Sequence, residues 1–237
     1  ALHYADTCIL PLFGGAKNST RIKLPMSDPN NSVLQDECFY DDLQQTLETA
    51  WMLLSQAATD RHSPMHTPVL ASISTDGKAS ARTAVLRHVD RQNHQLRIHT
   101  DMRSPKVAQL LDRSQCQVIA YHPSHKVQLR MEANARIHNA DPTARSIWND
   151  TPLSSRRCYL AEHPPGTPSP VPTSGLPEAV AGRVPDASES EPGFSKFAVL
   201  LITIDTLEWL YLAARGHRRA RFSWTADNDL KSEWLTP

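Results

Sequence analysis

The sequence predicts a mainly β protein with flanking helices, in which six or seven antiparallel strands form a barrel. After a first segment with a helical period, apolar and polar residues alternate with a period of two in several short runs. This alternation is typical of strands. The Asp76-Gly77 pair is a hairpin signal, and Pro123-Ser124-His125 joins two further runs, so the links are tight. A barrel is favoured over an open sheet because closure leaves no row of unpaired backbone groups at an edge.

The predicted elements follow one another along most of the chain. A helix is expected over 39–59, where Leu43, Leu47, Trp51 and Leu54 form one apolar stripe that covers a sheet. Two shorter helices are expected at 142–149 and 154–162. The strands are expected at 68–74, 79–89, 96–100, 117–122, 127–138, 197–212 and 220–224.

Composition limits the classes of partner. The 25 basic and 25 acidic side chains cancel, so no global field attracts nucleic acid or an anionic membrane, and any anion must bind at a local site. No apolar run approaches the roughly 20 residues that a membrane helix needs. The cysteines show no CxxC or CxxH spacing, which argues against a metal site and for reduced thiols in the cytoplasm. They are Cys8, Cys38, Cys116 and Cys158.

Two segments stand apart from the periodic sequence. Residues 1–25 show no clean periodicity, and we expect a disordered leader or an upstream extension before Met26, with one domain over 26–237. Residues 163–195 are rich in proline, which excludes helix and sheet interiors. Such a long loop is either a lid over a site or a mobile excursion, and we expect it to be disordered.

The segment 97–106 carries the clearest chemical signal. A strand is expected to end at Thr100, and a helix opens with Ser104 as N-cap and Pro105 at its first position. The free N–H groups of a helix N-terminus suit a phosphate, and Arg103 and Lys106 add full charges. From these residues alone, a phosphate site and an ordinary capped helix with solvated cations are both open.

Three further elements are weaker when each is taken alone. Arg82 and Arg87 have an odd separation, so a regular strand would put them on opposite faces, and a buried arginine calls for an anion. Gln128 lies among alternating apolar residues and could donate to a ring carbonyl or simply face solvent. The basic cluster 217–221 could also be only a solvated turn.

Taken together, these elements resemble a known family in order and spacing. The segments ARTAVLR (81–87), HTDMRSPK (99–106), VQLRMEANA (127–135) and HRRARFSW (217–224), with the closing WLTP, resemble the pyridoxamine 5′-phosphate oxidase-like FMN-binding split-barrel superfamily. The branch that looks closest is the Alr4036-type FMN-binding domain. The resemblance covers about 39–237 and implies a split β-barrel with FMN at the interface of a homodimer, which would bury both faces of the arginine-bearing strand.

The resemblance also implies roles for individual residues. The FMN phosphate would be held by Arg82, Ser104 and Lys106, with Arg103 as a further candidate. The remaining cofactor contacts would come, partly through main chain, from Thr83, Val85, Leu86, Arg87, His99, Thr100, Gln128 and Arg221. Arg87, His217 and Arg219 would face a small-molecule substrate, and no catalytic residue is nominated.

Departures from the family pattern bear on activity. Pro105 stands where true pyridoxamine phosphate oxidases have an arginine, and His217-Arg218-Arg219 swaps the residue types of their Arg-x-His motif. We therefore expect a pyridoxamine 5′-phosphate oxidase-like, FMN-dependent oxidoreductase. The alternatives are a true pyridoxamine/pyridoxine 5′-phosphate oxidase and a non-enzymatic flavin-binding or sensor protein.

Overall fold

The computed structural model describes residues 39–214, 216–225 and 227–237. The expected leader, 1–25, and the domain start at 26 lie outside the described residues. No helix in the described ranges is both long and apolar enough to cross a membrane.

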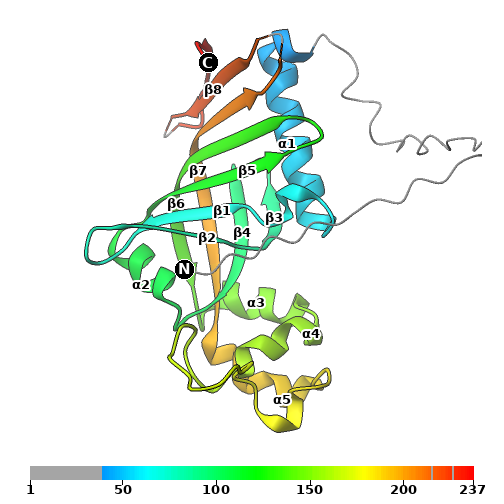
Figure 1. Ribbon diagram of the computed structural model, residues 1–237, viewed down its shortest axis with the longest axis vertical. Helices are drawn as coiled ribbons and strands as arrows, with labels where there is room; N and C mark the ends of the chain where they lie inside the picture. Colours follow the sequence, from blue (N-terminus) through cyan, green and yellow to red (C-terminus); the bar gives the residue numbers. More distant parts are fainter. Residues whose placement is uncertain (1–38, 215, 226) are drawn as a thin grey trace, which may run out of the picture. The chain divides into compact units, whose positions relative to one another are not determined.

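The described chain forms a mainly antiparallel sheet with flanking helices, as predicted (Figure 1). The strands are β1 (Val69–Ile73), β2 (Ala79–Thr83), β3 (Leu86–Asp90), β4 (Gln95–Asp101), β5 (Gln115–His122), β6 (Val127–His138), β7 (Phe197–Tyr211), β8 (Arg218–Trp224) and β9 (Leu230–Leu235). Seven of them run in the order β2-β1-β5-β6-β7-β4-β3, while β8 pairs with β7 and β9 with β8. β2 and β3 do not pair with each other, so the sheet is a split barrel.

The predicted number of six or seven strands is wrong, because the described residues form nine. The expected strand 79–89 is two strands that pair with different neighbours, β2 with β1 and β3 with β4. At the break, the Ala84 N–H donates to the Pro68 carbonyl at 3.0 Å. Arg82 and Arg87 therefore do not share one regular strand, and the inference that they point to opposite faces of it fails.

β7 organises the split. It pairs with β6 along most of its length, with β4 through its first half and with β8 through its second half. β4 and β8 therefore lie along the same edge of β7, one after the other. The sheet opens where the pairing with β4 ends and the pairing with β8 begins.

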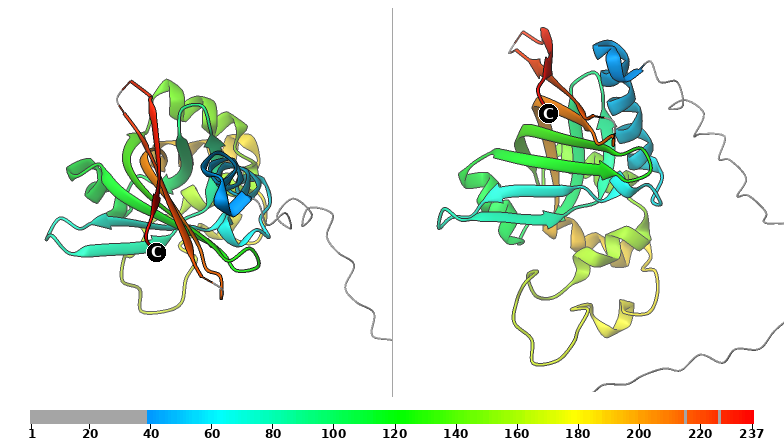
Figure 2. Two further views of the ribbon diagram at one scale, coloured as in Figure 1. Left: turned by 90° about the horizontal axis from the view of Figure 1, so that it is seen from above. Right: turned by 45° about the horizontal axis from the view of Figure 1, so that its top comes forward.

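The first helix covers part of the sheet, and the three helices between β6 and β7 lie together near one end of it (Figure 1). α1 (Leu43–Thr59) begins after Asp42, whose carboxylate accepts from the Gln45 N–H at 2.7 Å, and it packs against β3 (Figure 2). Its predicted stripe is buried at Leu47, Trp51 and Leu54. The other helices are α2 (Pro105–Asp112), α3 (Pro142–Asp150), α4 (Leu153–Arg156) and α5 (Ala187–Ser190), with short 3-10 turns at Phe39–Asp41, Pro64–His66, Arg157–Leu160, Glu178–Val180 and Glu191–Lys196. The helix expected at 154–162 is thus α4 followed by a 3-10 turn.

The stretch 163–195, for which disorder is expected from the sequence, is described throughout, and only its second half forms helical turns. Its second half holds α5, which Asp186 and Glu189 start with a capping box, and two 3-10 turns. Its first half, 163–174, has no helix or strand and is exposed throughout; we call it the Pro-rich segment. The Glu162 N–H donates to the Gly175 carbonyl at 2.9 Å, which closes the base of this segment.

Candidate functional site

The turn between β4 and α2, residues 100–106, forms a cationic centre that we call the phosphate turn. The Lys106 ammonium donates to the Thr100 hydroxyl at 2.9 Å and to the Ser104 hydroxyl at 3.2 Å. Ser104 stands at the N-cap as predicted, but its hydroxyl makes no capping bond and instead lies 3.2 Å from the Thr100 hydroxyl. Both hydroxyls therefore surround the ammonium.

Arg82 supplies a second cation beside this turn. Its guanidinium donates to the Ser72 hydroxyl at 2.7 Å and to the Gln109 side-chain carbonyl, on α2, at 2.9 Å. Burial lowers the pKa of Lys106, and the charge of Arg82 lowers it further, against an opposing effect of Asp101. In the described part of the chain, neither cation is within ion-pair distance of a carboxylate.

These residues fit the phosphate of FMN. Two like charges held together and partly buried are costly unless an anion joins them. Arg82, Lys106 and the hydroxyls of Thr100 and Ser104 offer donors, and none of these groups bonds a carboxylate of the described residues. The donor set is therefore that of an anion site, as the sequence predicts.

The Arg103 side chain does not join Arg82 and Lys106 at the phosphate turn. Its guanidinium contacts the Asp101 carboxylate at 2.8 and 3.0 Å. The same group donates to the backbone carbonyls of Ala161 and Glu162, both at 3.0 Å. Arg103 thus ties the phosphate turn to the start of the Pro-rich segment, a role that spacing alone does not reveal.

The residues around the break between β2 and β3 differ in exposure. Leu86 is fully buried, whereas Thr83 and Arg87 are exposed and Val85 is half-buried. Arg87 lines a cavity of about 210 Å³ together with Arg97 and His99. Asp150, Thr151 and Ser155 line its far side, with Ile147 and Pro152.

Arg97 and His99 present unsatisfied polar atoms at this cavity. Their side chains lie on one face of β4, whereas Leu96, Ile98 and Thr100 point from the other face into the core. Arg97 Nε and His99 Nε2 are buried and have no hydrogen-bond partner in the described ranges. Burial, followed by the charges of Arg97 and Arg87, lowers the pKa of His99 to about 3, so the ring is neutral at neutral pH. Sequence reasoning missed Arg97, although an arginine in an alternating strand two residues before His99 was the available signal.

A larger cavity, about 830 Å³, lies between His99, Thr100 and Asp101 and the Pro-rich segment. Cys158 and Tyr159 form part of its wall. His99 lines both this cavity and the smaller one, so the two spaces meet at one imidazole.

The other predicted site residues face the opposite side of the sheet. Arg82 pairs with Leu70, and the row continues through Val118 to Met131. Leu70, Val118 and Met131 are buried, so this row faces the core. Gln128 is three residues from Met131, so its side chain points to the outer face. Arg219 lies on the same outer face, since both Gln128 and Arg219 pair with Leu210.

Arg219 and Arg221 are held by a glutamate that the sequence reasoning did not single out. The buried carboxylate of Glu208, on β7, accepts from Arg219 at 2.6 Å and from Arg221 at 2.8 Å. Arg130, on β6, contacts it at 2.9 Å. His217 is exposed in the loop before β8. In the described structure its side chain makes no contact with Glu208 or the arginines around it.

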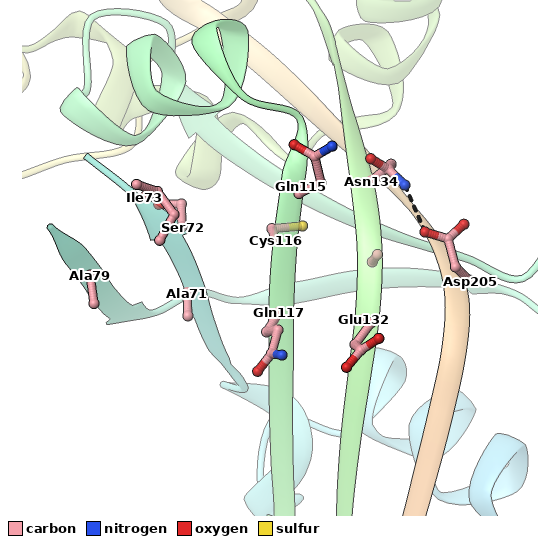
Figure 3. Close-up of a pocket in the computed structure, with 11 residues that line it drawn as sticks. Ala71, Ser72, Ile73, Ala79, Gln115, Cys116, Gln117, Glu132, Asn134 and Asp205 are labelled. Atoms are coloured by element: carbon pink, nitrogen blue, oxygen red, sulfur yellow. Dashed lines mark hydrogen bonds between the residues drawn. The ribbon is translucent and has the colours of Figure 1, made fainter. Parts of the chain in front are cut away.

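Figure 3 shows a pocket lined by residues of β1, β2, β5, β6 and β7. Its volume is about 470 Å³. Asn134 donates to Asp205 at 2.6 Å at its rim, and Cys116 lies in its floor. Burial, followed by the charge of Asp205, raises the pKa of the Cys116 thiol to about 12. The pocket contains none of the predicted site residues. Across the described ranges, no group of His, Cys, Asp and Glu side chains could hold a metal ion.

A split antiparallel sheet with a cationic turn between a strand and a helix is typical of split-barrel domains that bind a phosphorylated cofactor. Residues 48–139 match the family described as "Pyridoxamine 5'-phosphate oxidase, FMN-binding domain". The match takes in the phosphate turn and the break between β2 and β3, and the cofactor of the matched domain is FMN. No curated protein matches the chain.

Solved structures agree on the fold. A pyridoxamine 5'-phosphate oxidase-related, FMN-binding protein of Nostoc punctiforme is 20% identical, with a TM-score of 0.64 over 80% of this chain and 96% of that one. PhzG of Burkholderia lata, solved with tetrahydrophenazine-1-carboxylic acid, is 18% identical, with a TM-score of 0.62 over 84% and 96%. At these identities the likeness shows the fold alone, and the Alr4036-type branch stays a prediction.

Proposed function

We propose that the protein is an FMN-dependent oxidoreductase that acts on a small anionic substrate and works as a homodimer in the cytoplasm. The observation that carries the proposal is the pair of partly buried cations at the phosphate turn, Arg82 and Lys106, which have no carboxylate partner among the described residues. They lie within the region 48–139 that matches the FMN-binding domain.

The placement of the site residues supports a dimer. Arg82 faces the interior side of the sheet, whereas Gln128, Arg219 and Arg221 face the outside. A single copy does not turn both groups toward one ligand. In an isologous pair, the outer face of one copy would bring Gln128 and Arg221 to the phosphate turn of the other, as the family resemblance implies.

Bound FMN would supply the transfer of a hydride or an electron pair. The chain's own residues would hold and orient it: Arg82, Lys106, Thr100 and Ser104 would bind the phosphate, and the main chain of 83–87 would contact the ring, as the resemblance implies. His99 stays neutral beside this region because of its low pKa, so it adds no positive charge there.

The cavity of Arg87, Arg97 and His99 is our proposed place for the substrate's anionic group. Arg97 Nε is a buried donor without a partner in the described chain, and Thr151 and Ser155 add hydroxyls nearby. PhzG was solved with a carboxylic acid, and a carboxylate would satisfy the same kind of donors here. His217 and Arg219 would face the substrate from the second copy.

The first experiment is the visible absorption spectrum of the purified protein, with release and identification of the cofactor. Flavin bands and released FMN are the expected result. The apparent Kd for FMN should rise by about two to four orders of magnitude in Arg82→Ala/Lys106→Ala, because each of the two charge-assisted bonds contributes about 1.5–3 kcal/mol. Arg113→Ala, at the exposed end of α2, is the matched control.

Unchanged FMN affinity in the double variant would place the phosphate elsewhere and overturn the site. Turnover assays then separate the functions. Pyridoxal phosphate formed from pyridoxamine 5′-phosphate would identify a true oxidase, which the departures at Pro105 and 217–219 speak against. Tight FMN that no reductant or oxidant turns over would identify a non-enzymatic flavin-binding protein.

A further inference from the structure

Glu208 is the centre of a charge cluster on the outer face of the sheet. Its Oε1 accepts from Arg221 Nε at 3.1 Å and Nη2 at 2.8 Å, and its Oε2 accepts from Arg219 Nη2 at 2.6 Å. Arg130 Nη2 also lies 2.9 Å from Oε2. The strand register explains the meeting, because Arg130, Glu208 and Arg221 are direct neighbours across β6, β7 and β8.

The cluster keeps an excess of positive charge and of donors. Three guanidinium groups share one buried carboxylate, and the next carboxylate, Glu233 on β9, is 3.7 Å from Arg221. Arg130 Nε is buried without a partner in the described residues. The side chains of the three arginines are 29–39% exposed, whereas that of Glu208 is 7% exposed. The carboxylate therefore forms the floor, and the guanidinium groups form the surface.

Glu208 is ionised in this setting. Burial raises the pKa of its carboxyl, but the hydrogen bonds from Arg219 and Arg221, with the charge of Arg130, outweigh burial and leave the pKa below its usual value. An ionised carboxylate bonded to forked guanidinium groups restricts their rotation, since each Arg fork fits it in few geometries.

We propose that Glu208 is a positioning residue, which fixes Arg130, Arg219 and Arg221 as a rigid donor surface for the ring end of the flavin. The assignment to the ring end follows from the shared face and the short register distance to Gln128, because Gln128 pairs with Leu210, two residues after Glu208. This inference rests on the proposed function, because the flavin would be held by the phosphate turn of the second copy.

The test depends on whether Glu208→Gln raises or lowers the affinity for FMN. Glu208→Gln keeps the shape of the side chain and removes its negative charge, so the cluster becomes more positive. If Glu208 acted only through charge, this variant would bind the electron-rich flavin more tightly. If it positions the arginines, the full-length variant should bind FMN about tenfold more weakly, as measured by quenching of flavin fluorescence. Glu208→Asp, which keeps the charge at a shorter reach, should fall between the two.

Riboflavin identifies the end of the flavin that is affected. Glu208→Gln should weaken riboflavin and FMN by a similar factor, whereas Lys106→Ala should weaken FMN alone. Glu189→Gln, which removes an exposed ion pair with Arg183, controls for the loss of a glutamate. Equal or tighter FMN binding by a folded Glu208→Gln variant overturns the inference.

A second variant covers the case in which Glu208→Gln does not fold. Arg219→Lys/Arg221→Lys keeps both charges but loses the forks, and it should weaken FMN and riboflavin to a similar degree. Unchanged binding of both would overturn the inference equally. If the wild-type protein binds no flavin, the proposed function fails instead, so the two failures are distinct.

Discussion

Arg103 and Asp101 form a two-point ion pair inside the phosphate turn, with Nη2 2.8 Å from Oδ2 and Nε 3.0 Å from Oδ1. The same guanidinium donates to the carbonyls of Ala161 and Glu162, and the Lys196 ammonium also donates to the Ala161 carbonyl, at 2.9 Å. One side chain therefore links the turn beside the cofactor site to the base of the Pro-rich segment.

Arg103→Ala should loosen the Pro-rich segment. The change leaves the Asp101 carboxylate, whose side chain is 9% exposed, without its guanidinium partner, at a cost of about 2 kcal/mol. We expect faster cleavage within 163–174 in limited proteolysis, with an intermediate rate for Arg103→Lys, which keeps the charge but not the fork. Arg183→Ala, which breaks only an exposed pair with Glu189, should leave the rate unchanged. An unaltered rate in Arg103→Ala would show that other contacts hold the segment.

His99 should make the protein sensitive to mild acid. Its folded pKa of about 3 lies below the value of 6.5 for a free ring. As the pH falls below 6.5, the unfolded chain takes up a proton that the folded chain excludes, so stability falls by up to about 1.4 kcal/mol per pH unit until about pH 3. Urea unfolding between pH 7.5 and 5 should show a shallower decline for His99→Asn than for the wild type. The exposed His163, replaced by Asn, is the control, and parallel declines for wild type and His99→Asn would contradict the assignment.

Arg97→Met should stabilise the protein without ligand. Burial lowers the pKa of Arg97, against the charge of Asp150, and its Nε has no partner in the described chain. Replacing a poorly satisfied buried charge by an apolar side chain of similar length is commonly neutral or stabilising. A gain of about 1 kcal/mol would raise the Tm by roughly 2–4 °C for a chain of this size. Arg136→Met, at an exposed position of β6, should not raise it.

Gly193→Ala should destabilise the helical end of the sheet. A Cβ at Gly193 would lie 3.2 Å from the Tyr159 Cβ and 3.3 Å from the Trp148 ring. Trp148 is fully buried and packs on Phe197, so neither ring can move far. Overpacking of this kind costs about 1–3 kcal/mol, which chemical unfolding would measure. Gly182→Ala, where a Cβ meets nothing within 4 Å, is the matched control.

The sequence was sufficient for features with strong local signals. The apolar stripe of α1 and the alternation of β6 predict those elements, and β6 has the bounds expected, Val127–His138. Ser104 and Pro105 locate the start of α2, and with it the cationic turn. Each of these signals lies within a dozen or so consecutive residues.

Features that depend on distant partners could not be predicted. Ala84 and Val85 carry no turn signal, and only the pairing of β2 and β3 with different strands separates them. β9, with the sequence LKSEWL, lacks a clear apolar alternation because most of it is exposed or half-buried. The carbonyls that bind Arg103 are nearly 60 residues away, at separations of 58 and 59, and the arginines around Glu208 meet only when β6, β7 and β8 align.

The strands at the two ends of the sheet order, β2 and β3, are consecutive in the chain, with only Ala84 and Val85 between them. The opening of the barrel is therefore crossed by covalent bonds rather than by a ladder of hydrogen bonds. Three peptide steps reach at most roughly 10 Å, so the end of β2 and the start of β3 cannot move further apart than this. Thermal motion can change the angle between the two strands but not the separation of their linked ends, and a flat ring laid along this stretch would meet a gap of bounded width there.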